Sequence, residues 1–218
     1  MDLWPKRSHS KLGLGQVIPS YSQTRILTRR LIIRPYRPSD FHAWQEGHLT
    51  GKGLHRGRIS RSSFKSDLEF YRAAWKADLL YKFGIFEKKS GRHIGYLDIA
   101  THIRLRIQSA NLGYEIHRPF WRQGFCTEAC IALLRFCFQK LHFHRIEACA
   151  DKKNLASVKT ALAIGMKREG PRRQFYFNSD KKRWIDDEVF GAYPEDFGLR
   201  SKAPTVRLSL RSDLRLTK

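Results

Sequence analysis

A short glycine-bearing turn near the middle of the chain has the residue types and spacing of an anion-binding site. It follows a strand-like segment, residues 111–116, and precedes an apolar stripe at helical spacing, residues 127–140. The first backbone N–H groups of a helix have no acceptor and lie at the positive end of its dipole. Gly124 allows a ligand to approach this backbone closely. The pattern therefore predicts a phosphate-binding turn.

The cysteines near this turn do not have the spacing of a metal site. The four cysteines are Cys126, Cys130, Cys137 and Cys149. No Cys-x-x-Cys pair occurs among them. His142 and His144 follow closely, but they alternate with apolar residues as in a strand or loop. We expect small buried thiols in a reducing cytoplasm and no bound metal.

The spacing of apolar residues outlines the elements that must position the turn. Strands are predicted at residues 31–34, 81–87, 93–99, 112–116 and 145–150, with a final hairpin at 175–177 and 184–190. Helices are predicted to begin at Pro38–Asp40 and to cover residues 64–75, 127–140 and 154–164, with a loop from Gly47 to Arg61. This order indicates an α+β protein, a mixed sheet flanked by helices. We expect one domain over residues 26–197, a basic extension over 1–25 and a basic tail over 198–218.

Four segments along the chain support a more specific interpretation. They are Thr28 to Pro35 followed by Asp40 and Trp44, Phe120 to Ala129, Asn154 to Met166, and Trp184 to Phe190. In this order they resemble the motifs of the GNAT superfamily of acyl-CoA-dependent N-acetyltransferases, and within it the RimJ/RimL-like branch. The resemblance covers roughly residues 28 to 193. It implies the GNAT fold, a mostly antiparallel sheet flanked by helices that splays open where the acyl-CoA inserts.

The same resemblance implies which residues hold acetyl-CoA as co-substrate. Its pyrophosphate would lie on the backbone amides of Gln123, Gly124, Phe125, Cys126 and Thr127. Arg122 stands where the family usually has Gly, and its side chain either reaches a phosphate or points into solvent. The pantetheine arm would bond the backbone of Tyr114, Glu115 and Ile116 like an added strand, with Asn154 as a further contact. Asn154 also suits a helix N-cap, and the two roles are compatible.

Acyl transfer to an amine needs a polarised thioester, a neutral amine and a stabilised leaving thiolate. No nucleophilic triad is evident, so we expect direct attack in a ternary complex. Glu115 is the candidate base, acting through water, and Ser157 the candidate acid because Ala161 stands where many superfamily members have Tyr. A purely structural role for Ser157 is the alternative. Strand alternation turns Glu115 away from Tyr114, so only one of them faces the acceptor side.

Aromatic residues and one carboxylate are the candidates for the acceptor pocket. They are Tyr96, Tyr114, Tyr176, Trp184 and Asp186. Aromatic walls suit an amine-bearing substrate, and Asp186 could hold its positive charge before deprotonation. Core packing is the competing interpretation for each aromatic residue.

The chain carries a formal net charge of +22. Four basic and one acidic residue lie in residues 1–25, and six and one in residues 198–218, which leaves +14 in the predicted domain. Such a charge attracts polyanions such as ribosomal RNA or coenzyme A phosphates, or it reflects a generally basic proteome. No apolar run reaches the ~20 residues that span a bilayer. Residues 1–23 also lack the apolar segment of a secretory signal, so a cytoplasmic location is expected.

The branch analogy implies an N-acetyltransferase that acts on a protein N-terminal amine of the ribosomal-protein type. Two alternatives stay open. One is acetylation of a small amine such as an aminoglycoside or a polyamine, which the positive charge of the chain disfavours at long range. The other is a ribosome- or RNA-binding protein that uses a GNAT scaffold without turnover. The sequence carries no signal for the oligomeric state.

Overall fold

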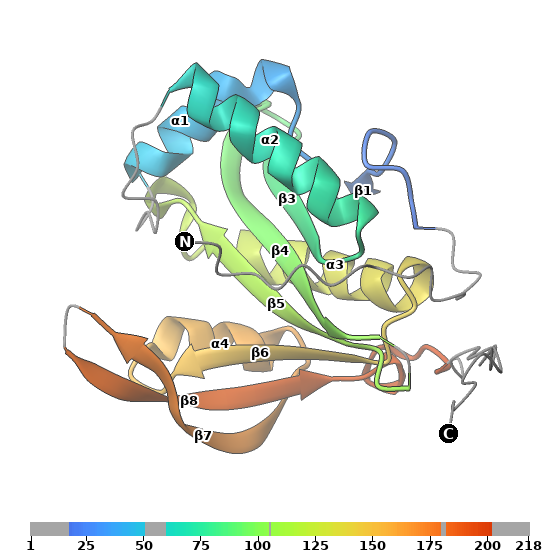
Figure 1. Ribbon diagram of the computed structural model, residues 1–218, viewed down its shortest axis with the longest axis vertical. Helices are drawn as coiled ribbons and strands as arrows, with labels where there is room; N and C mark the ends of the chain where they lie inside the picture. The colour runs from blue at the N-terminus through green and yellow to red at the C-terminus, as the bar shows by residue number, and fades with distance from the viewer. Residues whose placement is uncertain (1–17, 51–59, 105, 180–181, 202–218) are drawn as a thin grey trace, which may run out of the picture.

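A computed structural model of the chain describes residues 18–50, 60–104, 106–179 and 182–201 (Figure 1). The strands are β1 Ile26–Leu27, β2 Leu31–Arg34, β3 Leu80–Glu87, β4 His93–Ile103, β5 Ser109–Ile116, β6 Arg145–Asp151, β7 Lys167–Asn178 and β8 Arg183–Ala192. The α helices are α1 Phe41–Thr50, α2 Arg61–Lys76, α3 Phe125–Lys140 and α4 Leu155–Ala163. The predicted tails fall mostly outside the described residues, and so does part of the connection between β7 and β8, residues 180–181.

The eight strands form one sheet in the order β1-β2-β3-β4-β5-β6-β8-β7. Every neighbouring pair is antiparallel except β5 and β6, which run parallel. A parallel pair needs a crossover connection, and α3 supplies it between these two strands. The change of direction therefore falls in the middle of the sheet, directly beside the start of α3.

Helices cover the sheet on both faces. On one face, α3 and α4 pack on a core that includes Phe83, Leu97, Leu133 and Ile146, all fully buried. On the other face, α1 and α2 cover β2 to β4 through an aromatic cluster. The cluster residues are Tyr36, Phe41, Trp44, Phe64, Leu68, Tyr71 and Phe86. We call these the α3/α4 face and the α1/α2 face.

The beginning of the domain differs from the sequence prediction in one respect. A short 3-10 helix at Pro38–Asp40 leads into α1, as expected, but α1 continues through Gly47 to Thr50. The prediction of a loop from Gly47 is therefore wrong for residues 47–50. A Cβ atom on Gly47 would lie 2.5 Å from the His117 ring, so the missing side chain lets α1 lie close to the sheet. Glycine here serves packing and does not break the helix.

Part of the predicted N-terminal extension also packs on the domain. The Trp75 indole N–H donates to the carbonyl oxygen of Pro19 over 2.8 Å, and the ring of Tyr21 meets Trp75 edge-on. The described residues 18–25 therefore contribute to the folded body. The architecture as a whole confirms the predicted GNAT fold, an α+β sheet that is mostly antiparallel and flanked by helices.

Candidate active site

The parallel strands β5 and β6 are paired over only three residues each. Ser109, Ala110 and Asn111 face residues 145–147, and no pairing continues beyond Glu147. The remaining residues of β5 keep their partners on β4, and those of β6 keep theirs on β8. The two strands therefore diverge toward their carboxyl ends, and beyond this point the described residues show no ladder between the facing edges. Figure 1 shows the resulting separation of the β3–β5 half from the β6–β8 half.

Helix α3 starts at one side of this opening. Gly124 is its N-cap with φ +75°, and Arg122 two residues earlier also lies in the left-handed region with φ 59°. The first helical bond runs from the Glu128 N–H to the Gly124 oxygen, so the preceding N–H groups of the turn have no helical acceptor. Among the described residues, chain neighbours aside, the one heavy atom within 4 Å of a Cβ built on Gly124 belongs to Arg30, at 3.5 Å. The turn is therefore open at the start of a helix, and phosphate binding by residues 123–127 stays a prediction.

An ion pair that the sequence did not reveal holds the turn in place. The Arg30 guanidinium donates to Glu128 over 2.6 Å and to the carbonyl oxygen of Gln123 over 2.9 Å, and it lies 4.3 Å from the centre of the Phe125 ring. Thr28 donates to the same carboxylate. Burial raises the pKa of Glu128, but the hydrogen bonds from Thr28 and Arg30 outweigh it and hold the pKa below its usual range.

The residues of this ion pair are 98 positions apart, so their pairing could not be read from sequence spacing. An acidic residue in the first turn of a helix was the one available signal at Glu128. The partner strand could not be identified without the sheet order.

Helix α4 starts at the other side of the opening. Asn154 is its N-cap and accepts a long hydrogen bond of 3.4 Å from the Ser157 N–H. The phenol of Tyr114 on β5 lies 3.0 Å from the hydroxyl of Ser157 and donates to its carbonyl oxygen over 3.1 Å. Burial raises the pKa of Tyr114 above its ordinary value, so this phenol keeps its proton. The structure thus brings together the predicted acid Ser157 and the side chain of Tyr114, for which only a backbone role and a pocket wall were predicted.

Glu115 points to the α1/α2 face, opposite to Tyr114. The phenol of Tyr96, directly across on β4, donates to the Glu115 carboxylate over 3.1 Å. Burial, with the nearby Glu115 charge second, raises the pKa of Tyr96. The ammonium of Lys82 lies 3.4 Å from the centre of the Tyr96 ring and pairs with Asp98 at 2.9 Å. A carboxylate with a phenol donor therefore stands at the β5 side of the opening.

The register of the sheet shows which residues of β6 point to the same face as Glu115 on β5. Directly opposite partners point to one face, so Asn111 on β5 and Glu147 on β6 share the face of Glu115. Alternation then places Cys149 and Asp151 on that face of β6. Cys149 and Asp151 line the β6 side of the opening. They lie two and four residues beyond the last β5–β6 pair, as Gly113 and Glu115 do on β5.

The hairpin of β7 and β8 does not bring its three predicted pocket residues together. Tyr176 pairs with Ile185 and lies on the α1/α2 face, whereas Trp184 pairs with Phe177 and lies on the opposite one. Asp186 is also on that opposite face, and it accepts a hydrogen bond of 2.8 Å from the Gln174 N–H. Of these three residues, only Tyr176 lies on the same face of the sheet as Glu115.

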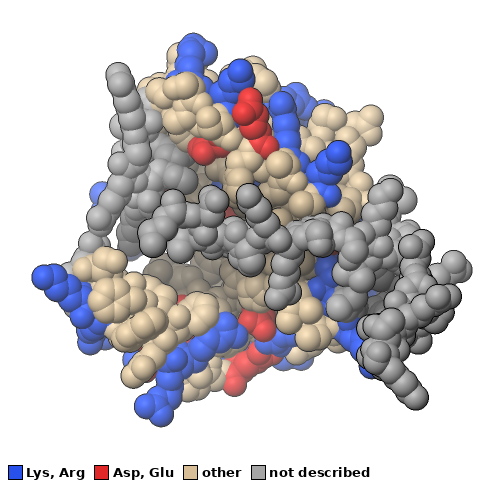
Figure 2. All heavy atoms as spheres, viewed as in Figure 1, with Lys and Arg blue, Asp and Glu red and all other residues tan. Residues whose placement is uncertain are grey.

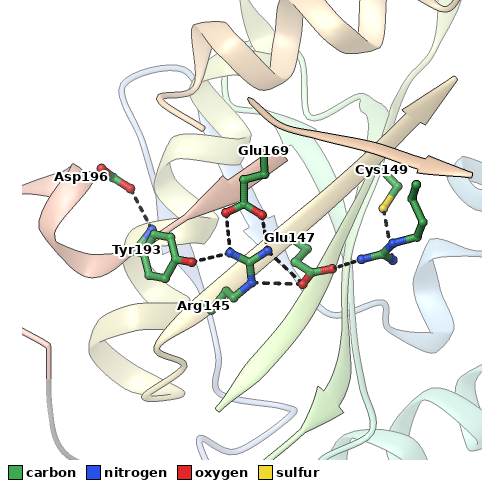
Figure 3. Close-up of polar contacts among 7 residues, drawn as sticks. Arg145, Glu147, Cys149, Glu169, Tyr193 and Asp196 are labelled. Atoms are coloured by element: carbon green, nitrogen blue, oxygen red, sulfur yellow. Dashed lines mark hydrogen bonds and ion pairs between the residues drawn. The ribbon is translucent and has the colours of Figure 1, made fainter. Parts of the chain in front are cut away.

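An ionic network fills the α1/α2 face of β6 and its neighbours (Figure 3). The Arg145 guanidinium bonds Glu147, Glu169 and the Tyr193 phenol, and Arg172 donates to Glu147 over 3.0 Å.

Within the described residues no three His, Cys, Asp or Glu side chains gather as a metal site. No described helix is long and apolar enough to cross a membrane. The four cysteines form no disulfide, and Cys130 and Cys137 are buried.

Comparison with known proteins agrees with this geometry. The Acetyltransferase (GNAT) domain family matches residues 30–167. The chain is 33% identical over 104 residues to YjcK of Bacillus subtilis, named as an N-acetyltransferase, and this match covers 48% of the chain. The chain spans about half the length of the first curated relatives that it matches, 58% for YjcK.

Two solved structures share the fold. One is a Vibrio cholerae protein named as a ribosomal-protein-serine acetyltransferase, with 26% identity, a TM-score of 0.66 and coverage of 79% of this chain and 98% of that one. The other is RimJ of Mycobacterium smegmatis in complex with a coenzyme A disulfide, with 22% identity, a TM-score of 0.68 and coverage of 76% and 83%. With the diverging strands and the helix-capped turn, these matches show that the chain belongs to the GNAT acetyltransferase family.

Proposed function

We propose that the protein transfers an acetyl group from acetyl-CoA to a primary amine, and that the amine is a protein N-terminus. The observation that carries this proposal is the end of β5–β6 pairing after three residues, beside the open N-terminal turn of α3. An extended ligand arm can bond the free strand edge while its phosphates lie on the turn. The GNAT family supplies the chemistry of the donor.

The phosphate end of the donor would be held by the backbone amides of residues 123–127. Gly124 leaves that approach open, and the Arg30–Glu128 pair fixes the turn. Because Glu128 neutralises part of the Arg30 charge, the turn depends on backbone N–H groups more than on a free cation. The exposed Arg122 adds positive charge beside it.

The reacting end would lie between the diverging strands. The amine nitrogen forms a bond with the acetyl carbon as the carbon–sulfur bond breaks, the amine proton passes through water to Glu115, and the departing sulfur takes a proton from the Ser157–Tyr114 pair. Tyr114 keeps its proton because burial raises its pKa, so it can donate to a developing thiolate. Tyr96 orients the Glu115 carboxylate.

A protein N-terminus is the acceptor that the comparisons favour. The Vibrio cholerae neighbour, at 26% identity, is named for a ribosomal protein as its substrate. Figure 2 shows Lys and Arg over both halves of this face with smaller groups of Asp and Glu among them, so the surface suits approach to a ribosomal particle. A non-catalytic RNA-binding role rests on the same charge, but it leaves the diverging strands without a use.

The test combines turnover with a charge variant of the turn. Release of the coenzyme A thiol is measured with acetyl-CoA and peptides bearing different N-termini, in parallel with polyamines and aminoglycosides, and products are identified by mass spectrometry. We expect acetylated peptide N-termini. Acetylation of small amines alone would replace the proposed acceptor, and no turnover with any amine would overturn the enzyme assignment.

Gly124→Asp and Gly124→Asn separate charge from backbone strain, because both residues tolerate a left-handed conformation. The aspartate should weaken coenzyme A binding at least tenfold more than the asparagine, since it places a carboxylate where the phosphates approach. Gly91→Asp is the matched control, because Gly91 also has a positive φ of +69° and open space around it but lies at a distant hairpin. Equal binding by all three variants would contradict the assigned phosphate site.

A further inference from the structure

The α1/α2 face carries a row of carboxylates on both sides of the opening. Along β4, β5, β6 and β8, register and alternation place on it Asp98, Glu115, Glu147, Asp151 and Asp187. In a chain of net charge +22, five carboxylates on one face of four neighbouring strands form an unusual acidic surface. What each carboxylate bonds therefore decides whether the surface is structural or binds a ligand.

Four of these carboxylates have a partner within the described chain. Asp98 accepts from Lys82, Glu115 from Tyr96, Glu147 from Arg145 and Arg172, and Asp151 from the backbone N–H of Lys153. Ion pairs or local hydrogen bonds account for them. They need no ligand to be satisfied.

Asp187 is the exception. It is 5% exposed, and its Oδ1 atom is sealed from solvent without a hydrogen-bond partner in the described residues. A buried oxygen left unpaired costs about 1–3 kcal/mol, so native structures rarely keep one unless a ligand or another group completes it. The cation directly across on β7, Arg172, is bonded to Glu147 at 3.0 Å and lies 3.9 Å from the Cys149 sulfur instead.

The position of Asp187 connects it to the opening. It pairs with Asp151, the last residue of β6, so the β6–β8 ladder ends at this pair. Asp151 stands across the opening from Glu115, at the same distance beyond the last β5–β6 pair. A group held between Asp151 and Asp187 would therefore face the predicted base from the opposite strand.

We propose that Asp187, with Asp151 beside it, is the binding site for the ammonium form of the acceptor amine. This inference rests on the proposed acetyltransferase function and names the residue that recognises its acceptor. The acceptor's ammonium group donates a hydrogen bond to the Asp187 oxygen that has no partner, because Arg172 bonds Glu147 instead. Charge-assisted hydrogen bonds of this kind are about twice as strong as neutral ones. The ammonium then releases one proton to solvent, and the neutral amine passes its second proton through water to Glu115 as it attacks.

The electrostatics of the site agree with this geometry. Burial, and then the neighbouring charge of Asp151, raise the pKa of Asp187, while Arg172 on β7 lowers it. From β6 the Cys149 thiol also lies within electrostatic reach of this carboxylate. A second positive charge from the acceptor would relieve the repulsion between the two carboxylates. Acceptor affinity should accordingly fall as the pH drops and Asp187 takes a proton.

The test measures steady-state kinetics of full-length Asp187→Asn with a peptide acceptor. We expect KM for the peptide to rise about tenfold, the effect of losing one charge-assisted contact, with little change in kcat and unchanged coenzyme A affinity. The matched control is Glu188→Gln, which removes a like charge from the next residue, on the opposite face and paired with the exposed Arg168. A second acceptor whose reacting nitrogen is neutral at the assay pH, the hydrazide of an N-terminally blocked peptide, should lose the difference between wild type and variant.

Each outcome decides the proposal. An unchanged peptide KM in Asp187→Asn, or a rise equal for the ammonium and the hydrazide acceptor, would overturn it. So would a rise in Asp186→Asn without one in Asp187→Asn. If Asp187→Asn does not fold, Asp151→Asn decides in its place, and a normal KM there would overturn the pair. Absence of turnover with any amine in the wild type would instead overturn the proposed function, and the acceptor site that rests on it.

Discussion

The α1/α2 face of the sheet is covered by apolar packing in one half and by ion pairs in the other. Over β2 to β4, helices α1 and α2 bury an aromatic cluster in which Phe64 is 3% exposed and Trp44 is 4% exposed. Over β6 to β8, the described residues place no helix on that face, and the network around Arg145 occupies it (Figure 3). The burial of apolar rings is not an electrostatic interaction that salt can screen, whereas partly exposed ion pairs are weakened by salt.

This difference has a consequence for the opening between β5 and β6. One side is a wall whose position is set by dispersion and burial, and it carries Glu115 and Tyr96. The other side is held by charges whose partners can exchange, and it carries Asp151 and Asp187. We infer that the first half fixes the reacting groups and the second half adapts to the acceptor. Three predictions test this comparison.

The largest expected effect comes from removing an aromatic ring of the first half. Phe64 packs 4.9 Å from Trp44 and 5.8 Å from Phe41 between ring centres. Phe64→Ala should lower the free energy of unfolding by about 3–5 kcal/mol, because a buried ring is lost and a cavity remains. Urea denaturation measures it, and the loss should be the same at low and high salt. A marked salt dependence would contradict the contrast between the halves.

Acid should destabilise the first half through a buried histidine. The Tyr36 phenol and the carbonyl oxygen of Ala43 hold the His93 ring at 2.9 and 3.0 Å. Burial, then the nearby His117, lowers the pKa of His93 to about 3. The folded state keeps His93 neutral while the unfolded chain takes up a proton below about pH 6.5. Stability is therefore full above that pH and decreases as the pH falls toward 3.

At pH 4 this loss amounts to roughly 3 kcal/mol relative to neutral pH. In His93→Gln the group that titrates is gone, so its free energy of unfolding should fall less steeply between pH 6.5 and 4. Denaturant titrations at several pH values provide the comparison. Equal slopes for wild type and variant would show that other groups govern the acid sensitivity.

The smallest effect is expected in the second half. The side chains of Arg145, Glu147 and Glu169 are 19%, 13% and 32% exposed, so their pairing is only partly shielded from solvent. Arg145→Met should cost about 1–3 kcal/mol, between the values for surface and buried ion pairs, and salt should reduce this cost. Arg168→Met, at an exposed pair with Glu188 of 3.7 Å, should stay within about 0.5 kcal/mol.

A salt titration of both Arg variants supplies the sharpest comparison with Phe64→Ala. Burial raises the pKa of Glu147, but bonds from Arg172 and Arg145 lower it below its usual range. The contribution of this network is therefore present above the carboxylate's ordinary pKa and is lost as the pH falls below it. An Arg145→Met cost that equals the Phe64→Ala cost would remove the distinction between the halves.

Local sequence determined the elements on which the site is built. The turn before α3, the helix cap at Asn154 and the strand before the turn follow from glycine geometry, capping chemistry and period, and all three appear where they were predicted. Four ordered motifs added the family and its fold, which the sheet order and the family match confirm. Each of these signals depends on residues close together in the chain, so a single sequence is enough to recognise it.

Only the tertiary structure decided which side chains meet. The Arg30–Glu128 pair joins residues 98 positions apart, and the Tyr114–Ser157 contact crosses the opening. The choice between Asp186 and Asp187 depends on the β6–β8 register, which pairs Asp187 with Asp151, since one residue of slip exchanges the two faces of a strand. Pairing across a sheet is set by the summed fit of many side chains, and no short stretch of sequence records that sum.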